Sequence, residues 1–328
     1  MEVFDQLMRG VAAVASPGGN GASLTVLLYH RVLRQPDPLM PQVPDVATFN
    51  HQISALAHVF RIMALDEALM RLREGTLPPR ALCITFDDGY LDNIQVAVPV
   101  LRNNGVSATF FVATGFLDGG RMMHDTVVEA VRRLPSQECD LTWIGLGMRS
   151  ISDIDSRVRL VDEFVGKIKY LPQLEREAAS ERLAHKVGHQ LPDDLMMSSD
   201  DLRRMVDSGM SVGCHTHDHP ILSMVDSDEA WTQIVKSRDA VAAATGVAPT
   251  LFAYPNGKPN IDYRAEHVAM VKKAGFSGAA SVSFGTASRD SDHFQVPRFV
   301  PWDSDPRHLV FRILAHPWRH RGTAVADA

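Results

Sequence analysis

Thr85-Phe86-Asp87-Asp88-Gly89 follows the apolar run Ala81 to Ile84, so two adjacent carboxylates stand at the end of a buried strand and a glycine comes directly after them. The carboxyl ends of strands are where open α/β sheets and barrels build their active sites. Neighbouring carboxylates repel each other unless a cation or a shared proton relieves the repulsion. The stretch therefore predicts an α/β fold with a metal site at one rim of its sheet.

Two histidines at a second strand end complete the set of ligands. His215 and His219 follow the run Ser211 to Cys214, and one turn of helical backbone would point both imidazoles the same way. Asp-Asp-Gly by itself is most often a turn in which an aspartate caps the backbone, so its combination with the histidines carries the inference. One carboxylate with two imidazoles leaves positions open for water and substrate. We predict one divalent metal on Asp88, His215 and His219, zinc first, with iron, cobalt or nickel as alternatives.

The composition narrows the class of protein. The chain has 328 residues, of which 45% are hydrophobic and 22% charged, so it can bury a large core. Its formal net charge of -6 excludes nucleic-acid binding, which normally needs a basic surface. Cys83, Cys139 and Cys214 have no metal-cluster spacing, and we expect them to be buried thiols without a disulfide.

The N-terminal segment, residues 1–23, bears on localisation. It carries acids where a secretory signal carries bases, and the chain has no run of about 18 uncharged apolar residues such as a membrane span needs. This predicts a cytoplasmic protein, with membrane association as the alternative. A short amphipathic helix from Val3 to Ala15 is expected to dock on the domain. No pattern indicates an oligomeric state.

From residue 24 onwards, apolar strands alternate with helices, which is typical of a parallel α/β sheet or barrel. The fold class we predict is α/β, a distorted or incomplete (β/α)7-type barrel. Its seven strand candidates are 24–29, the acidic strand from 81, 108–113, 211–214, 250–254, 278–282 and 294–300.

Residues 117–198 break this rhythm with charged stretches of helical period at 157–168 and 174–187, so we expect a mostly helical insertion. His124 and Asp125, at the start of that region, are interpreted as an ordinary loop. The predicted domain covers residues 24–316, and a solvated tail covers 317–328.

With these residues in hand, the chain resembles the NodB-like polysaccharide deacetylases, the carbohydrate esterase family that removes acetyl groups from N-acetylated sugars. Thr85 to Gly89 is similar to the family's first motif. His215 to Leu222 fits the second motif, H-[ST]-x-x-H-x-x-L, and Phe252 to Gly257 resembles the third.

Two departures from the family pattern stand out. The third motif usually begins with an arginine that orients the catalytic aspartate, and Ala253 stands there, so Arg298 is the candidate replacement from the next strand. The late histidine motif is also missing. Tyr29-His30 ends the first strand, as in the circularly permuted poly-N-acetylglucosamine deacetylases, and this subset is the better match.

The residues and the resemblance together imply a role for each member of the site. Asp87 would be the general base, and His30 would protonate the departing amine. The backbone N–H of Asn256 would hold the oxyanion, and Leu222 would line the pocket for the acetyl methyl. Two further candidates for stacking on a sugar ring are Tyr254 and Trp302, although core packing is the first expectation for each.

The leading hypothesis is a metal-dependent hydrolase that removes N-acetyl groups from an N-acetylhexosamine-containing polysaccharide or lipid-linked oligosaccharide in exopolysaccharide assembly. One alternative is an amidohydrolase that opens small cyclic amides. A second alternative is a non-catalytic glycan-binding protein with the same fold, which the missing arginine at Ala253 suggests.

Overall fold

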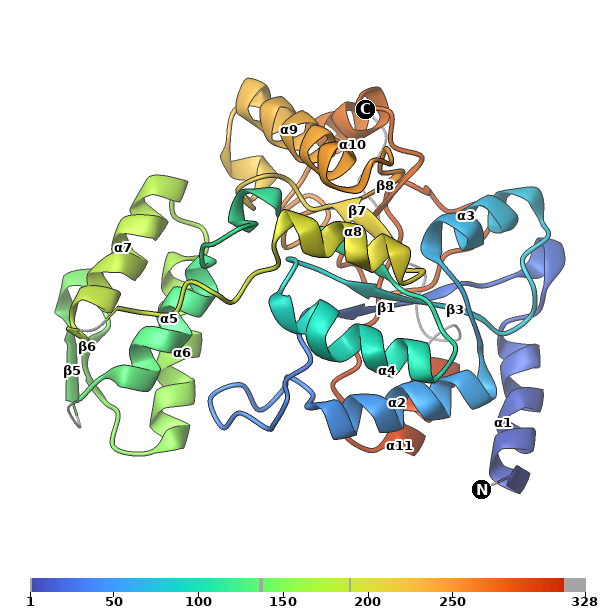
Figure 1. Ribbon diagram of the computed structural model, residues 1–328, viewed down its shortest axis with the longest axis horizontal. Helices are drawn as coiled ribbons and strands as arrows, with labels where there is room; N and C mark the ends of the chain where they lie inside the picture. The colour runs from blue at the N-terminus through green and yellow to red at the C-terminus, as the bar shows by residue number, and fades with distance from the viewer. Residues whose placement is uncertain (1, 136–137, 189, 316–328) are drawn as a thin grey trace.

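The fold is described from a computed structural model, in which the described residues are 2–135, 138–188 and 190–315. Its centre is a curled sheet of parallel strands in the order β1-β3-β4-β7-β8-β9, with β2 added to β3 (Figure 1). The predicted α/β barrel class is confirmed. The strands of this sheet are β1 (Thr25–Tyr29), β2 (Arg61–Ile62), β3 (Ala81–Phe86), β4 (Thr109–Val112), β7 (Ser211–Cys214), β8 (Leu251–Ala253) and β9 (Gly278–Ala280).

Residues 294–300, predicted as the seventh strand, close the barrel without forming a strand. Val296 makes an isolated bridge to Ala280 of β9, and Phe299 makes one to Leu27 of β1. The seventh strand of the sheet is β2, whose two residues are too short for any period to reveal. The barrel is therefore distorted, because single bridges and not a continuous ladder join its two edges.

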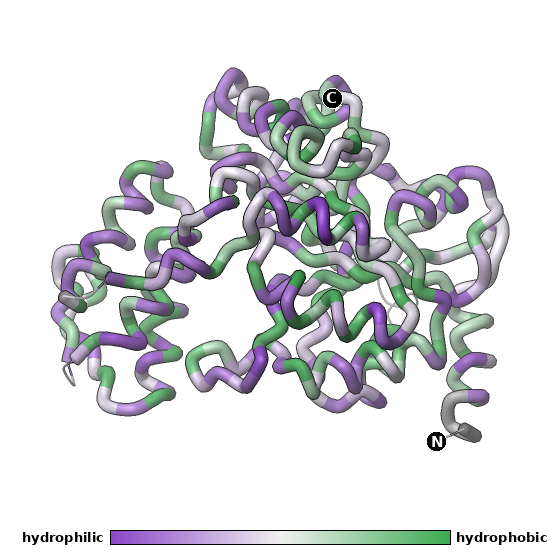
Figure 2. Tube along the Cα trace, viewed as in Figure 1, coloured by the Kyte–Doolittle hydropathy of each residue, from purple (hydrophilic) through white to green (hydrophobic). Residues whose placement is uncertain are grey.

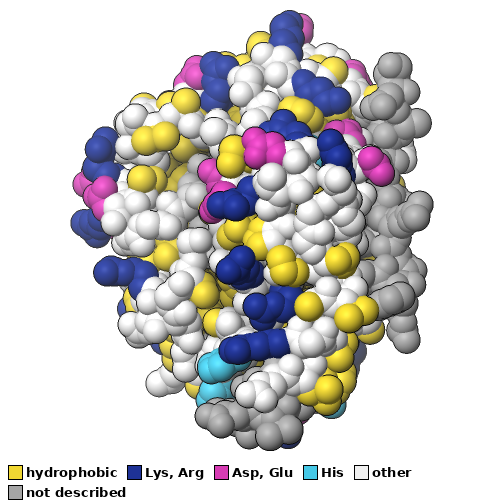
Figure 3. Space-filling view, turned by 90° about the vertical axis from the view of Figure 1, so that its right-hand side faces the viewer, with side chains coloured by type: hydrophobic (Ala, Val, Ile, Leu, Met, Phe, Trp, Pro, Cys, Tyr) yellow, Lys and Arg dark blue, Asp and Glu magenta, His cyan; other side chains and the backbone are white. Residues whose placement is uncertain are grey.

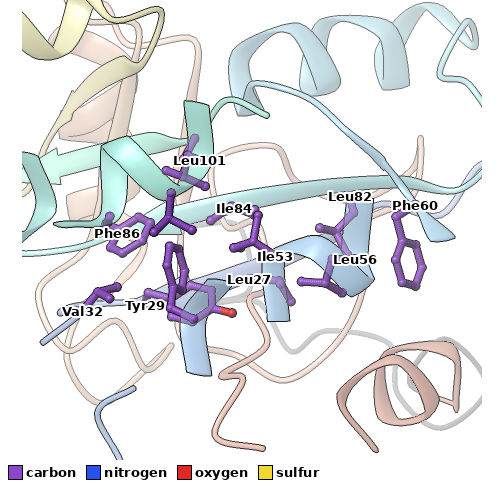
Figure 4. Close-up of a cluster of buried hydrophobic side chains, with 14 of the residues drawn as sticks. Leu27, Tyr29, Val32, Ile53, Leu56, Phe60, Leu82, Ile84, Phe86 and Leu101 are labelled. Atoms are coloured by element: carbon purple, nitrogen blue, oxygen red, sulfur yellow. The ribbon is translucent and has the colours of Figure 1, made fainter. Parts of the chain in front are cut away.

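Helices surround the sheet and bury their apolar sides against it, and Figure 2 shows hydrophobic and hydrophilic positions alternating along them. Figure 4 shows Ile53 and Leu56 of the helix α2 against Leu27 and Ile84 of the strands. The three cysteines are buried free thiols, as predicted. The surrounding helices are α2 (Val46–Val59), α3 (Leu65–Glu74), α4 (Val98–Asn103), α8 (Ser199–Asp207), α9 (Ser227–Thr245), α10 (Ala265–Lys273) and α11 (Pro306–Ala315).

The insertion forms a lobe beside the barrel with an apolar core of its own (Figure 1). It is mostly helical, as expected, but it begins with a helix where we predicted a loop at His124 and Asp125, because Met123 to Arg133 buries an apolar face in that core. A short antiparallel hairpin was also not predicted. The elements of the lobe are α5 (Met123–Arg133), β5 (Glu138–Leu141), β6 (Gly147–Ser150), α6 (Ile154–Ile168) and α7 (Gln173–His185).

The N-terminal helix α1 (Glu2–Ala15) docks on the barrel through Met8 and Ala12, which are buried in the main core. Leu7, Val11 and Val14 are exposed on its outer side. Figure 3 views this side of the molecule and shows a short row of Lys and Arg side chains among hydrophobic ones. Within the part of the chain that is described, no helix is both long and apolar enough to cross a membrane. The predicted tail, 317–328, lies outside the described residues.

Candidate active site

A cavity of about 810 Å³ opens at the carboxyl ends of the strands, between the barrel and the helical lobe. Because the strands are parallel, the residues that follow β1, β3, β7 and β8 meet at this one rim. The lobe supplies the opposite wall from α5, α6 and α7. Six of the predicted site residues line the cavity, namely His30, Asp87, Asp88, His215, His219 and Asn256.

The two aspartates leave β3 in different directions because the backbone reverses between them. Asp87 still continues the sheet, and its N–H donates to the carbonyl of Tyr29 at 3.0 Å. Asp88 has a φ of 78° and Gly89 a φ of 93°, both left-handed. A Cβ on Gly89 would stand 2.8 Å from Cγ1 of Val112, so only glycine fits the turn.

The loop that carries the histidines is not helical, which corrects our prediction of a helical turn. Left-handed residues at Thr216 (φ 63°) and His219 (φ 54°) fold it back, so that Nε2 of His219 comes within 3.2 Å of Nε2 of His215. The Oε1 atom of the buried Gln233 accepts hydrogen bonds from the N–H groups of His217 and Asp218, and so anchors the loop on α9. Such strain in non-glycine residues is typical of functional sites.

Asp88, His215 and His219 form the one group of three potential metal ligands found among the described residues. The Oδ1 atom of Asp88 lies 3.6 Å from Nε2 of His215 and 3.5 Å from Nε2 of His219. Ligands about 2.1 Å from a tetrahedral ion lie roughly 3.4 Å from one another, so these separations fit one ion. The Nδ1 atom of His215 lies 2.7 Å from the carbonyl of Ala253, which directs a free Nε2 lone pair into the site.

The electrostatics of the cluster favour a cation. Burial raises the pKa of Asp88 well above its usual value, and the neighbouring charge of Asp87 raises it further. Burial also lowers the pKa values of His215 and His219, so both imidazoles are neutral and able to act as ligands. A divalent ion would stabilise the Asp88 carboxylate and accept both lone pairs.

Arg298 meets Asp87 in a buried two-point ion pair. Its Nη1 and Nη2 donate to the two carboxylate oxygens at 2.7 and 2.8 Å, and its Nε donates to the carbonyl of Ser281 at 2.9 Å. Arg298 is 1% exposed and comes from the segment that closes the barrel. Burial of Asp87 opposes its ionisation, but the charge and hydrogen bonds of Arg298 prevail and lower its pKa to about 2. Asp87 is thus a fixed carboxylate.

His30 follows β1 and presents an exposed side chain to the cavity. The Nδ2 atom of Asn93 donates to its carbonyl at 2.8 Å, which fixes the backbone there. Desolvation by the cavity walls lowers the pKa of His30 to about 4, while the charge of Asp87 acts in the opposite direction. Water that reaches the exposed ring also opposes this desolvation.

Three predicted substrate contacts do not reach the cavity. Tyr254 is fully buried, stacks on Tyr263 with ring centroids 3.9 Å apart and donates to the carbonyl of Phe294, so it packs in the core. Leu222 is likewise buried in the core beneath the histidine loop. Trp302 is 57% exposed, and its contact is the guanidinium of Arg312. Core packing is what the sequence analysis expects first for Tyr254, whereas Leu222 and Trp302 lie away from their predicted positions, because a residue near a motif has no signal for the side it faces.

A polar network at the mouth of the cavity was missed entirely. Arg31 donates to Asp92 at 2.8 Å and lies 3.5 Å from Asp125 of the lobe. Tyr90 donates to the other oxygen of Asp125 at 3.0 Å. This network joins the ends of β1 and β3 to α5, so it holds the lobe over the site. No spacing in the sequence could reveal it, since its members come from three distant segments.

A carboxylate and two imidazoles at the rim of a parallel α/β barrel are an arrangement typical of hydrolases that use a metal ion. A sequence model of the polysaccharide deacetylase family matches residues 74–142 and 171–279, more than half of the chain. The chain belongs to this family, whose members are hydrolases that remove N-acetyl groups. It shares 22% identity over 278 residues with YxkH of Bacillus subtilis, named as a polysaccharide deacetylase, covering 84% of this chain and 71% of YxkH.

Other relatives agree with this assignment. The peptidoglycan-N-acetylmuramic acid deacetylase PdaC of Bacillus subtilis is 23% identical over 230 residues, and the match covers 67% of this chain but about half of PdaC (48%). The solved deacetylase PplD of Streptococcus pyogenes has a TM-score of 0.60 at 17% identity, with 88% of this chain and 97% of PplD covered. The structure of IcaB from Ammonifex degensii has a TM-score of 0.54 at 20% sequence identity, and the match covers 90% of this chain and 98% of IcaB. These likenesses establish the fold, and the circular permutation stays a prediction.

Proposed function

We propose that this protein is a metal-dependent N-deacetylase of glycans that contain N-acetylhexosamine, such as an exopolysaccharide or its lipid-linked precursor. The observation that carries the proposal is the convergence of two sets of residues on one cavity. Asp88, His215 and His219 form the metal cluster, and Asp87 and His30 stand beside it. Among the relatives, PdaC acts by its name on N-acetylmuramic acid of peptidoglycan, which supports a glycan substrate.

The residues present fit a divalent ion, which Asp88 would hold through a carboxylate oxygen and the two histidines through Nε2. A bound divalent ion supplies Lewis acidity, which lowers the pKa of water and polarises an amide carbonyl. Zinc suits the donor set best, and iron, cobalt and nickel are compatible with it.

The chain's own residues divide the proton transfers of amide hydrolysis between them. Asp87 accepts the proton of the attacking water, and Arg298 holds its carboxylate in one plane. His30 takes up the proton that the water gives to Asp87 and delivers it to the amine nitrogen as the C–N bond breaks, so that acetate and the free amine are the products. Asn256, with a φ of 58°, presents its backbone at the cavity, where its N–H can bind the developing oxyanion.

The two alternatives are less favoured. The scaffold hypothesis rested on the missing arginine at Ala253, and the guanidinium of Arg298 now pairs with Asp87. A cavity of about 810 Å³ is much larger than a small cyclic amide requires, and its size favours an oligosaccharide.

The test is an acetate-release screen with the metal-loaded protein. Its substrates are chitooligosaccharides and poly-N-acetylglucosamine fragments, and the ring opening of small cyclic amides, which releases no acetate, is followed in parallel by mass spectrometry. We expect acetate from at least one glycan and none from the same glycan with Asp87→Asn. Turnover of cyclic amides alone would reject the proposal, and tight glycan binding without metal or acetate release would support the scaffold.

A further inference from the structure

Arg176, on the cavity-facing side of α7, is a buried cation whose side chain has no hydrogen-bond partner among residues 2–135, 138–188 and 190–315. It is 8% exposed, and its Nε atom is fully enclosed and makes no hydrogen bond. No ion pair of its guanidinium occurs among the described residues. Glu177, whose charge acts on Arg176, is exposed and accepts a hydrogen bond from Gln173. An enclosed guanidinium in this state is costly unless a further partner arrives.

The position of Arg176 connects it to the proposed chemistry. It lines the same cavity as the metal cluster. A group bound to Arg176 would therefore belong to the same molecule whose amide lies at the cluster.

The other arginines of the cavity are already paired. Arg31 binds Asp92 and Asp125, while Arg121 donates to Thr126 and to the carbonyl of Pro192. Lys169, half-buried at the end of α6, is a second cation on the same wall as Arg176. Of the carboxylates that the lobe contributes to this cavity, the buried Asp125 is already paired with Arg31 and Tyr90. The others are exposed, so solvent screens their competition; they are Asp162, Glu177 and Glu181.

We propose that the substrate of this deacetylase is an acidic glycan, and that Arg176 binds a carboxylate or phosphate carried on or beside the N-acetylated sugar. Apolar side chains of the lobe, Val158, Val161 and Val165, line the same wall of the cavity. In such surroundings a charge-assisted pair between guanidinium and anion is strong and can be two-pronged. This inference rests on the proposed function and adds the class of substrate.

Substrate selectivity tests it. Three oligosaccharides of equal length are compared, one of neutral N-acetylglucosamine, one with the lactyl carboxylate of N-acetylmuramic acid and one with a terminal phosphate. We expect the wild type to prefer one acidic substrate, and the arm that wins identifies carboxylate or phosphate. Arg176→Met should reduce the ratio of acidic to neutral kcat/KM by about tenfold to a hundredfold, mainly through KM. Arg176→Lys should keep most of it, and the exposed control Arg102→Met should keep all of it.

An unchanged ratio in Arg176→Met, or no preference in the wild type, would overturn the proposal. Binding of the acidic oligosaccharides, measured by calorimetry, separates this failure from failure of the proposed function. If no substrate releases acetate but the acidic ones bind the wild type and not Arg176→Met, the anion site stands and the deacetylase proposal falls. Arg176→Gln, which also removes the charge but keeps a polar side chain, serves in both measurements should Arg176→Met not fold.

Discussion

Arg298 donates two hydrogen bonds to Asp87 from 211 positions further along the chain, and both side chains are buried. In the family pattern the arginine stands in the third motif, where this chain has Ala253. Here the segment that closes the barrel between β9 and β1 supplies the cation. A charge can thus keep its place in space while its place in the sequence changes.

Replacing Arg298 by Met would leave the Asp87 carboxylate buried without a cation. We expect a loss of about 3–5 kcal/mol in the free energy of unfolding, measured with urea, because an uncompensated buried charge remains. Acetate release should fall at least about a hundredfold, since the base is no longer held in one orientation. The exposed Arg102→Met is the matched control. Equal stability of Arg298→Met and Arg102→Met would show that the pair does not hold Asp87.

Acid should weaken the protein through Asp87. Because its pKa falls from 3.8 to about 2 on folding, its contribution is fully present above pH 4 and is lost as the pH falls through 2. The size of this contribution is about 2 kcal/mol. Urea unfolding of metal-free wild type and Asp87→Asn at intervals between pH 5 and pH 2 measures it. A stability difference between the two proteins that does not change with pH would refute this assignment.

The metal cluster predicts a sharp contrast within one loop. His215→Ala and His219→Ala should lose nearly all bound zinc in metal analysis, because each removes one ligand. His217→Ala should keep about one equivalent, since His217 bonds to Thr114 and points away from the cluster. Retention of zinc by His215→Ala would place the ion elsewhere.

The Asp88→Asn variant should separate the effect of Asp88 on the stability of the metal-free protein from its effect on zinc binding. In metal-free protein the buried carboxylate of Asp88 repels that of Asp87. The Asp88→Asn variant, which removes this repulsion, should therefore unfold at the same temperature as the wild type or at a higher one. Addition of zinc should raise the unfolding temperature of the wild type and leave that of Asp88→Asn unchanged. A zinc-induced rise in the variant would contradict the role of Asp88.

His30→Ala should lower kcat by about a hundredfold to ten-thousandfold while zinc content stays at the wild-type level. Because the His30 side chain is exposed in the cavity, imidazole in the buffer can enter the space that it leaves. We therefore expect added imidazole to restore part of the rate. A kcat near that of the wild type would remove His30 from the reaction.

The residues that lie next to strand ends were predictable, because parallel strands bring their carboxyl ends to one rim. The positions of Asp87, Asp88 and His215 follow from that rule. The pairing of Arg298 with Asp87 was predictable because the family's usual arginine is replaced by Ala253 in this chain. The path of the histidine loop was not predictable, since left-handed backbone at Thr216 has no signal in residue type.

Contacts between the lobe and the barrel also lay beyond the sequence. The partners of Arg31 and the isolation of Arg176 depend on where α5 and α7 pack over the rim. Periodicity predicts that these stretches are helical, but it does not say which barrel residue each helix faces. The fold and the metal cluster with Asp87 could therefore be predicted from the sequence, whereas the residues that form the walls of the cavity could not.

The most direct test of the account is acetate release from an N-acetylated glycan by protein stripped with a chelator and then titrated with zinc. Activity should vanish on stripping and return in proportion to bound zinc, reaching a plateau at one ion per chain. Acetate release that survives complete removal of metal, or a fully loaded protein that releases none from any N-acetylated glycan, would contradict it.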